Sequence, residues 1–441
     1  MILNSKYPSL ASTFSNPHSC FPRREAERKA VKMGMEMEID VDIATLQVPL
    51  PVDISVGLAA PPTANLFVPP LPISKTCVYK TVEGKLDIAV DVYLPASTSS
   101  RSSKIKSGNG DGQSKIKGSG KGHGKGDLHP IMLFVHGGAW LGSNRSDYCR
   151  PLFHQFLELG FVVTSMDYRL RPETSLEGQL EDVRDVEGWL RGEGGLGEVL
   201  REIGTSGSQH GKGIQVDTEK IVVVGASAGA HLALLTPTLW TKPPSAILSM
   251  YGPTTIHSLQ YQQKGRFTKR CSLPCTAETL AAATNYGQPP TEKKISQTGQ
   301  DNYRPRNIMA RHLFENGIMA EFLIKGLVRG KDGELYFPQP GSVSKDEIDK
   351  ISPLHLLTTR QYPYPPVYQV MGTSDDVFDP LHVHDFHDAL TAQGIPAHKV
   401  LVPNVLHAFD ILAEIGGEVH REIVGPAVRW VARWVGEVGE E

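Results

Sequence analysis

The chain is 441 residues long, with 40% hydrophobic residues, 21% charged residues and a formal net charge of -3. This composition is ordinary for a globular protein and gives no reason to expect nucleic acid or an acidic membrane as a partner. No apolar run approaches the ~20 residues of a spanning helix, so we expect no transmembrane segment. The five cysteines are odd in number and scattered, which argues against a disulfide framework and favours a reducing compartment, the cytoplasm.

The N-terminal part of the chain is rich in Ser, Pro and short apolar fragments, and we predict a loosely ordered leader over residues 1–73. Residues 1–24 contain no Asp or Glu and end in Arg23-Arg24, a weak sign of a transit peptide. We favour a disordered extension, because no amphipathic periodicity accompanies these charges. A single α/β domain is predicted over residues 74–441.

Two segments open this domain. Residues 77–94 alternate apolar and polar side chains around a turn at Glu83-Gly84, which predicts an antiparallel hairpin. The next segment, residues 96–129, is dominated by Gly, Ser and Lys. It cannot bury enough apolar surface to offset its ordering entropy, so we predict a disordered basic loop and assign it no chemistry.

From residue 131 onwards, short apolar runs alternate with helical patterns. This alternation is typical of a mostly parallel central sheet with helices on both faces, which is the α/β fold class that we predict. The predicted strands are residues 131–135, 161–165, 221–224, 246–250, 367–371 and 399–402. Helices are predicted over residues 175–191, after Pro380, and from Ile423 to residue 436.

Residues 256–350 interrupt the alternation with a polar portion, followed by a helical pattern from Ile308 to Leu327. The segment follows one core strand and precedes another. Ligands bind at the carboxyl ends of parallel strands in such sheets, so we expect the segment to form a cap or lid over that edge. An irregular surface excursion is the alternative.

The run Gly225-Ala226-Ser227-Ala228-Gly229 is a G-x-S-x-G motif between a buried strand and an apolar helix. The glycines permit a sharp turn, so the hydroxyl projects from the end of the sheet beside helix N-terminal N–H groups. Ser227 is therefore the predicted nucleophile. An ordinary tight turn that carries a serine is the alternative, and the next motif counts against it.

A second glycine motif, with Gly137-Gly138 between His136 and Trp140, follows another predicted strand. Adjacent glycines let backbone N–H groups approach the oxygen of a reacting carbonyl. We predict an oxyanion hole made by the amides of Gly137, Gly138 and Ala228, the last being the residue after the nucleophile.

Together with the run MDYRLRPE from Met166 to Glu173, these motifs resemble the α/β-hydrolase fold and, within it, the hormone-sensitive-lipase-like esterase branch. The resemblance covers residues 76–95 and 130–436 and is specific, because three motifs occur in the family's order. Ala139 stands where many of these esterases have a third glycine. Kynurenine formamidases share the His-Gly-Gly-x-Trp pattern and often a Ser-Ala-Gly-Ala-His elbow, so formamide chemistry stays open.

The resemblance implies the chain order serine, acid, histidine. Asp375 lies three residues past Gly372, in the loop after the strand at 367–371, and matches the family's acid. Asp376 and Asp379 in the same loop are competing candidates.

The base is predicted to be His407, because it follows the last strand and precedes the small-aromatic pair Ala408-Phe409. The other histidines of this region lie on or near predicted helices: His382, His384, His387 and His398.

Three more polar residues near the motifs are expected to lie outside the chemistry. His231, four residues after Ser227, is expected to lie along the helix rather than serve as a second base. Asp167 and Arg169 are expected to brace loops around the site.

These residues predict a serine hydrolase that cleaves small-molecule carboxylic esters through an acyl-enzyme on Ser227, with no metal and no organic cofactor. An arylformamidase that hydrolyses N-formylkynurenine-type amides is the alternative within enzymes. A catalytically inactive binding protein with the same pocket is the alternative outside them.

Overall fold

The computed structural model of the chain describes residues 71–95, 128–205, 213–257, 274–284, 303–359 and 362–436. The predicted leader lies outside the described residues as far as position 70, and the predicted basic loop as far as position 127. The loop prediction was one residue too long at its end, because His129 already begins a strand.

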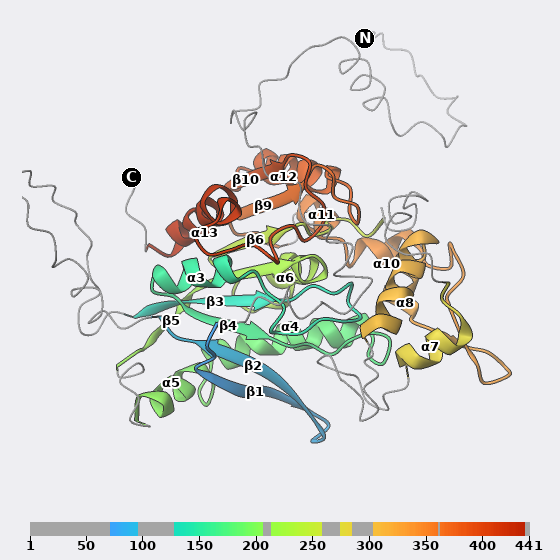
Figure 1. Cartoon of the computed structure of the whole chain (residues 1–441), viewed down its shortest axis with the longest axis horizontal. Coiled ribbons are helices and arrows are strands. Elements are labelled where there is room, and N and C mark those ends of the chain that lie inside the picture. Colours follow the sequence, from blue (N-terminus) through green and yellow to red (C-terminus); the bar gives the residue numbers. More distant parts are fainter. Residues whose placement is uncertain are drawn as a thin grey trace, which may run out of the picture. The chain divides into compact units, whose positions relative to one another are not determined.

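An eight-stranded sheet lies at the centre of the described part, in the order β1-β2-β4-β3-β5-β6-β9-β10 (Figure 1). The strands from β4 to β10 in this order are parallel, whereas β2 is antiparallel to both of its neighbours. The strands are β1 (Lys75–Val82), β2 (Leu86–Tyr93), β3 (His129–Val135), β4 (Val162–Met166), β5 (Val216–Ala226), β6 (Ala246–Met250), β9 (Val367–Gly372) and β10 (Ala397–Val402).

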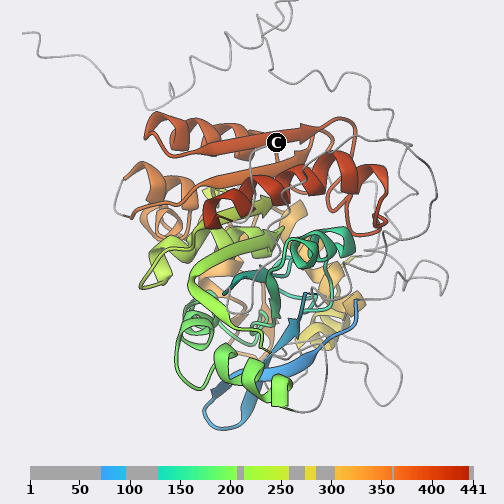
Figure 2. The same cartoon turned by 90° about the vertical axis from the view of Figure 1, so that its left-hand side faces the viewer.

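Helices cover both faces of this sheet, which is why its central strands are apolar on both sides. Every residue of β4, β6 and β9 is buried. Figure 2 shows α3 and α13 on one face and α4, α6 and α12 on the other. The helices outside the inserted segment are α3 (Arg150–Glu158), α4 (Leu176–Arg191), α5 (Leu196–Thr205), α6 (Ala228–Leu239), α11 (Pro353–Thr358), α12 (Leu381–Ala392) and α13 (Gly425–Ala432).

The hairpin and all six strands predicted from the sequence are present within a few residues of their expected bounds. The predicted final helix begins earlier than expected, at Val419, and consists of a π-helical turn, α13 and a short 3-10 turn that ends at Val435. In the described part of the chain, no helix is long and apolar enough to span a bilayer.

The segment between β6 and β9 contributes a separate group of short elements, and we call its described residues 274–284 and 303–351 the insertion. Figure 1 shows its helices, coloured yellow to orange, gathered beside one end of the sheet. Its elements are α7 (Ala277–Thr284), α8 (Tyr303–Glu315), α9 (Met319–Lys325), β7 (Val328–Arg329), β8 (Leu335–Tyr336) and α10 (Lys345–Asp349).

The prediction of a single helix from Ile308 to Leu327 was wrong. The structure has two helices there, separated by Gly317, whose φ of 63° is a left-handed conformation that ends α8. The apolar spacing continued across the break because residues of both helices pack into the core.

Candidate active site

Ser227 occupies the sharp turn between β5 and α6. Its φ of 55° and ψ of -121° are strained for a residue with a side chain, and its N–H is held by the carbonyl of Met250 at 2.9 Å. A Cβ on Gly225 would lie 2.3 Å from the carbonyl oxygen of Gly229, and a Cβ on Gly229 would lie 2.1 Å from that of Val135. Both glycines of the motif are therefore required by close backbone packing.

The imidazole of His407 bridges the serine and an acid. Its Nε2 lies 2.9 Å from Oγ of Ser227, and its Nδ1 lies 2.8 Å from Oδ2 of Asp375. The histidine is in the loop after β10 and the aspartate in the loop after β9, so parallel neighbouring strands carry them to the same edge of the sheet. Both side chains are buried.

Asp375 is fixed by its own loop. Its Oδ1 accepts hydrogen bonds from the backbone N–H groups of Val377 and Phe378, both at 2.8 Å, which leaves Oδ2 for the histidine. The competing carboxylates make other contacts: Asp376 accepts from the backbone N–H of His407 at 3.3 Å, and Asp379 from that of Leu381 at 3.0 Å.

The remaining histidine candidates lie elsewhere in the structure. His382, His384 and His387 belong to α12, and His398 belongs to β10. His382 is buried and accepts a hydrogen bond at Nδ1 from the backbone N–H of Thr254.

The predicted oxyanion residues lie beside the serine. A Cβ on Gly137 would lie 3.1 Å from Cβ of Ser227, so this glycine allows the loop to approach the nucleophile. Gly138 has a φ of 95°, and a Cβ there would lie 2.1 Å from the carbonyl oxygen of Gly142. Ala228 begins α6, whose first N–H groups have no partner within the helix and carry partial positive charge.

His231 lies along α6, as expected, and is buried. Its Nδ1 lies 3.3 Å from Nε1 of Trp140, and its Nε2 lies 2.8 Å from the carbonyl oxygen of Ile351. Burial lowers the pKa of His231 from 6.5 to about 4. The ring is therefore neutral near pH 7, with an N–H that donates to Ile351 and a lone pair that accepts from the indole of Trp140.

The loop-bracing roles expected of two charged residues agree with their contacts. Asp167 accepts a 2.8 Å hydrogen bond from the backbone N–H of Arg145 and forms an ion pair with its side chain. Arg169 donates to Asp182 at 2.9 Å and 3.0 Å. Both residues thus tie loops to the body of the domain.

Sequence reasoning missed the aromatic surroundings of His407. The rings of Tyr251 and Phe378 lie edge-on to the imidazole, with centroids 4.8 Å and 5.4 Å away. The hydroxyl of Tyr251 donates to Oδ1 of the buried Asp410 at 2.8 Å. The signal in the sequence was the position of Tyr251 directly after a predicted strand, where side chains face the site.

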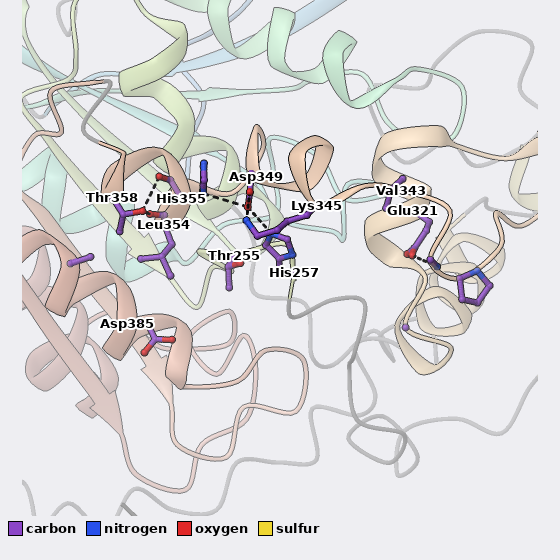
Figure 3. A pocket seen from close by; sticks show the side chains of 14 residues that line it. Thr255, His257, Glu321, Val343, Lys345, Asp349, Leu354, His355, Thr358 and Asp385 are labelled. Carbon is purple, nitrogen blue, oxygen red and sulfur yellow. Dashed lines mark hydrogen bonds and ion pairs between the residues drawn. The ribbon is translucent and has the colours of Figure 1, made fainter. Parts of the chain in front are cut away.

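A cavity of about 860 Å³ separates the insertion from α11 and α12, and the serine, aspartate and histidine described above are not among its lining residues. Figure 3 shows His257, Lys345 and His355 gathered around Asp349 in this cavity. The cavity is thus polar where the insertion meets the body. Across the described ranges of the chain, no group of three or more His, Cys, Asp or Glu side chains is placed to hold a metal ion.

A family model described as the alpha/beta hydrolase fold matches residues 132–295. This match confirms the α/β-hydrolase fold that the three motifs predicted. It begins in β3 and includes both glycine motifs, so it contains the predicted nucleophile and oxyanion residues.

Several curated relatives are fungal polyketide synthases. The non-reducing polyketide synthase ausA of Emericella nidulans is 26% identical over 369 residues, which cover 78% of this chain and 13% of that protein. The non-reducing polyketide synthase adrD of Penicillium roqueforti is 29% identical over 382 residues, which cover 80% of this chain and 14% of that protein. The chain thus spans about one-seventh of the length of these relatives.

Solved structures that align with the chain include an esterase of Thermogutta terrifontis with bound propionate, which is 16% identical. The alignment covers 83% of this chain and 95% of that chain, with a TM-score of 0.44. A protein of unknown function from Staphylococcus aureus aligns over 82% of this chain and 99% of that chain, with 14% identity and a TM-score of 0.47.

Proposed function

We propose that this chain, which has the α/β-hydrolase fold, is a serine hydrolase that cleaves carboxylic esters through an acyl-enzyme on Ser227. The observation that carries the proposal is the imidazole of His407 within hydrogen-bond distance of both Ser227 and Asp375. A serine hydroxyl is a weak nucleophile alone, and this arrangement supplies the base and the group that orients it.

In the acylation step, Nε2 of His407 takes the proton of Ser227 as Oγ attacks the acyl carbon. The carboxylate of Asp375 holds the Nδ1–H tautomer and stabilises the imidazolium that forms. When the tetrahedral intermediate collapses, the imidazolium gives its proton to the departing alkoxide. Water then enters, His407 removes its proton, and the acid leaves as Ser227 is protonated again.

The amides of Gly137, Gly138 and Ala228 would bind the oxyanion of each tetrahedral intermediate. Removal of one such donor typically raises the barrier by about 3–4 kcal/mol. The position of Ser227 at the first turn of α6 adds the partial positive charge of the helix N-terminus. Under this proposal the insertion is a lid, and it selects the substrate.

The polyketide synthase relatives favour a second candidate, release of an acyl chain held as a thioester. The same acyl-enzyme would form, with a thiol as the leaving group in place of an alcohol. Water, or a hydroxyl group of the acyl chain itself, would then take the acyl group from Ser227.

A single set of assays tests both candidates. Incubation with a fluorophosphonate, followed by intact mass and peptide mapping, should place the adduct on Ser227, and Ser227→Ala should abolish it. Folded wild-type protein that stays unlabelled would overturn both candidates and leave an inactive binding protein.

Turnover of three acyl donors then separates the leaving groups. The donors are p-nitrophenyl acetate, an acyl-N-acetylcysteamine thioester and N-formylkynurenine. The proposal predicts the highest kcat/KM for the ester, and a higher value for the thioester would establish the second candidate. A clear preference for the formamide would identify an arylformamidase.

A further inference from the structure

Arg306 is a charged residue of the insertion that is almost completely buried, with 1% of its side chain exposed. It lies on α8 and reaches into the body of the domain. A buried guanidinium is costly unless its donors are satisfied and its charge is paired. The contacts that compensate this burial indicate what the residue does.

The guanidinium of Arg306 binds two backbone carbonyls and one carboxylate. Nη1 donates to the carbonyl oxygen of Leu141 at 2.8 Å and to that of Arg171 at 2.5 Å. Nη2 forms an ion pair with Glu173. Leu141 is the residue after Trp140, so the insertion contacts the end of the second glycine motif.

That motif forms a strained turn. Gly138, Ala139 and Trp140 all have positive φ angles, of 95°, 53° and 62°. The N–H groups of Leu141 and Gly142 both donate to the carbonyl oxygen of Gly138, at 3.0 Å and 2.9 Å. Left-handed residues with side chains are unfavourable, so the surroundings must hold such a turn in place.

Residues outside the insertion supply part of the stabilisation of this turn. The carbonyl oxygen of Trp140 accepts hydrogen bonds from the backbone N–H of Arg171 and from Nε2 of Gln179, both at 2.9 Å. Arg306 supplies the adjoining contact at Leu141 from the insertion. It also binds the carbonyl oxygen of Arg171, so one guanidinium joins the loop that contains Leu141 to the loop that contains Arg171.

We propose that Arg306 is a positioning residue for the oxyanion hole: through the Leu141 carbonyl, the insertion holds the strained turn that aims the Gly137 and Gly138 amides at the reacting carbonyl. This inference rests on the proposed hydrolase function. It gives the insertion a role in the chemical step in addition to substrate selection.

The competing explanation is that Arg306 only attaches the insertion to the body through Glu173. The two explanations differ in whether Glu173→Gln should lose as much activity as Arg306→Met. Glu173→Gln weakens the attachment but leaves the guanidinium on the Leu141 carbonyl. Arg306→Lys keeps the charge but has one donor nitrogen in place of three, and Arg306→Met removes the charge and every donor.

The test is the steady-state hydrolysis of p-nitrophenyl acetate by wild type and these three variants, with circular dichroism as a check of folding. Arg306→Met should lower kcat by about 10- to 100-fold with KM within twofold, because oxyanion stabilisation acts in the transition state. Arg306→Lys should recover part of the loss. Glu173→Gln should keep kcat within threefold of wild type.

A double-mutant cycle gives a measurement that would not change if Arg306 only attached the insertion to the rest of the domain. Ala139→Gly relieves strain in the turn, so the effect of Arg306→Met on kcat should be at least threefold smaller in the Ala139→Gly background. If Arg306→Met does not fold, Arg306→Lys is used in the same cycle.

The outcomes distinguish the positioning role of Arg306 from the hydrolase function. Equal losses in Arg306→Met and Glu173→Gln, or full kcat in folded Arg306→Met, would overturn the positioning role. Failure of wild-type Ser227 to react with a fluorophosphonate would instead overturn the hydrolase function itself.

Discussion

The hydroxyl of Tyr251 donates a 2.8 Å hydrogen bond to Asp410, and the ring of the same tyrosine lies edge-on to the imidazole of His407. Tyr251 has a φ of 43°, a left-handed conformation that costs free energy. Asp410 is buried, and burial raises the pKa of its carboxyl group. A strained residue and a buried acid are therefore joined next to the proposed base.

Tyr251→Phe should destabilise the protein by about 1–3 kcal/mol, because a buried acceptor loses its donor. The folded pKa of Asp410 is above its ordinary value, so its contribution to stability falls as pH rises through the folded pKa. Loss of the hydroxyl raises that pKa further. Urea unfolding should therefore show a larger deficit for Tyr251→Phe at pH 8 than at pH 5.

Asp410→Asn is the matched control for this pair. It keeps an oxygen acceptor for the Tyr251 hydroxyl and removes the buried charge. Its stability at pH 8 should equal or exceed that of wild type. If Tyr251→Phe loses the same stability at both pH values, ionisation of the Asp410 carboxyl group does not contribute to that loss.

Asp375→Asn should lower kcat for the ester by about 10³- to 10⁴-fold, because an amide favours the wrong tautomer of His407. Asp379→Asn is the control from the same loop, since Asp379 contacts the backbone of Leu381, and it should stay within threefold of wild type. Asp376→Asn should cost less than tenfold, because Asp376 binds the backbone N–H of His407, whereas Nδ1 of the imidazole binds Asp375. A loss at Asp376 larger than that at Asp375 would reassign the acid.

The lowered pKa of His231 predicts that the free energy of unfolding depends on pH. Its folded pKa of about 4 is below the unfolded value of 6.5, so the unfolded chain binds more protons between these values. Stability from this residue is present above pH 6.5 and is lost as pH falls towards 4. Wild type should lose about 2–3 kcal/mol more than His231→Gln between pH 7.5 and pH 4.5 in urea unfolding. Parallel pH profiles for the two proteins would contradict this account.

The strands and the candidate nucleophile could be predicted from the sequence because their signals are local. The strand at 246–250 has four apolar residues out of five and the predicted bounds, and the turn at Ser227 is marked by glycines that backbone packing requires. For the acid, the sequence located the loop and favoured Asp375. The structure distinguishes it from Asp376 by which atom of His407 each one contacts.

The contacts that the sequence could not predict join residues far apart in the chain. Tyr251 and Asp410 are 159 positions apart, and Arg306 and Leu141 are 165 positions apart. Neither arginine nor aspartate is expected in a buried position unless its partner is known. The break at Gly317 was missed for a related reason, because apolar spacing records burial and not the path of the backbone.

Ala139→Gly should stabilise the protein, because Ala139 has a φ of 53°, a left-handed conformation that favours glycine. A left-handed alanine costs about 1–2 kcal/mol, and the greater flexibility of an unfolded glycine offsets about 0.5–1 kcal/mol of that. The free energy of unfolding should rise by about 0.5–1 kcal/mol in urea titrations. The control is Ala389→Gly within α12, where the backbone is helical and the same change should cost about 1 kcal/mol. If both glycine variants lose stability equally, the turn at Ala139 is not strained.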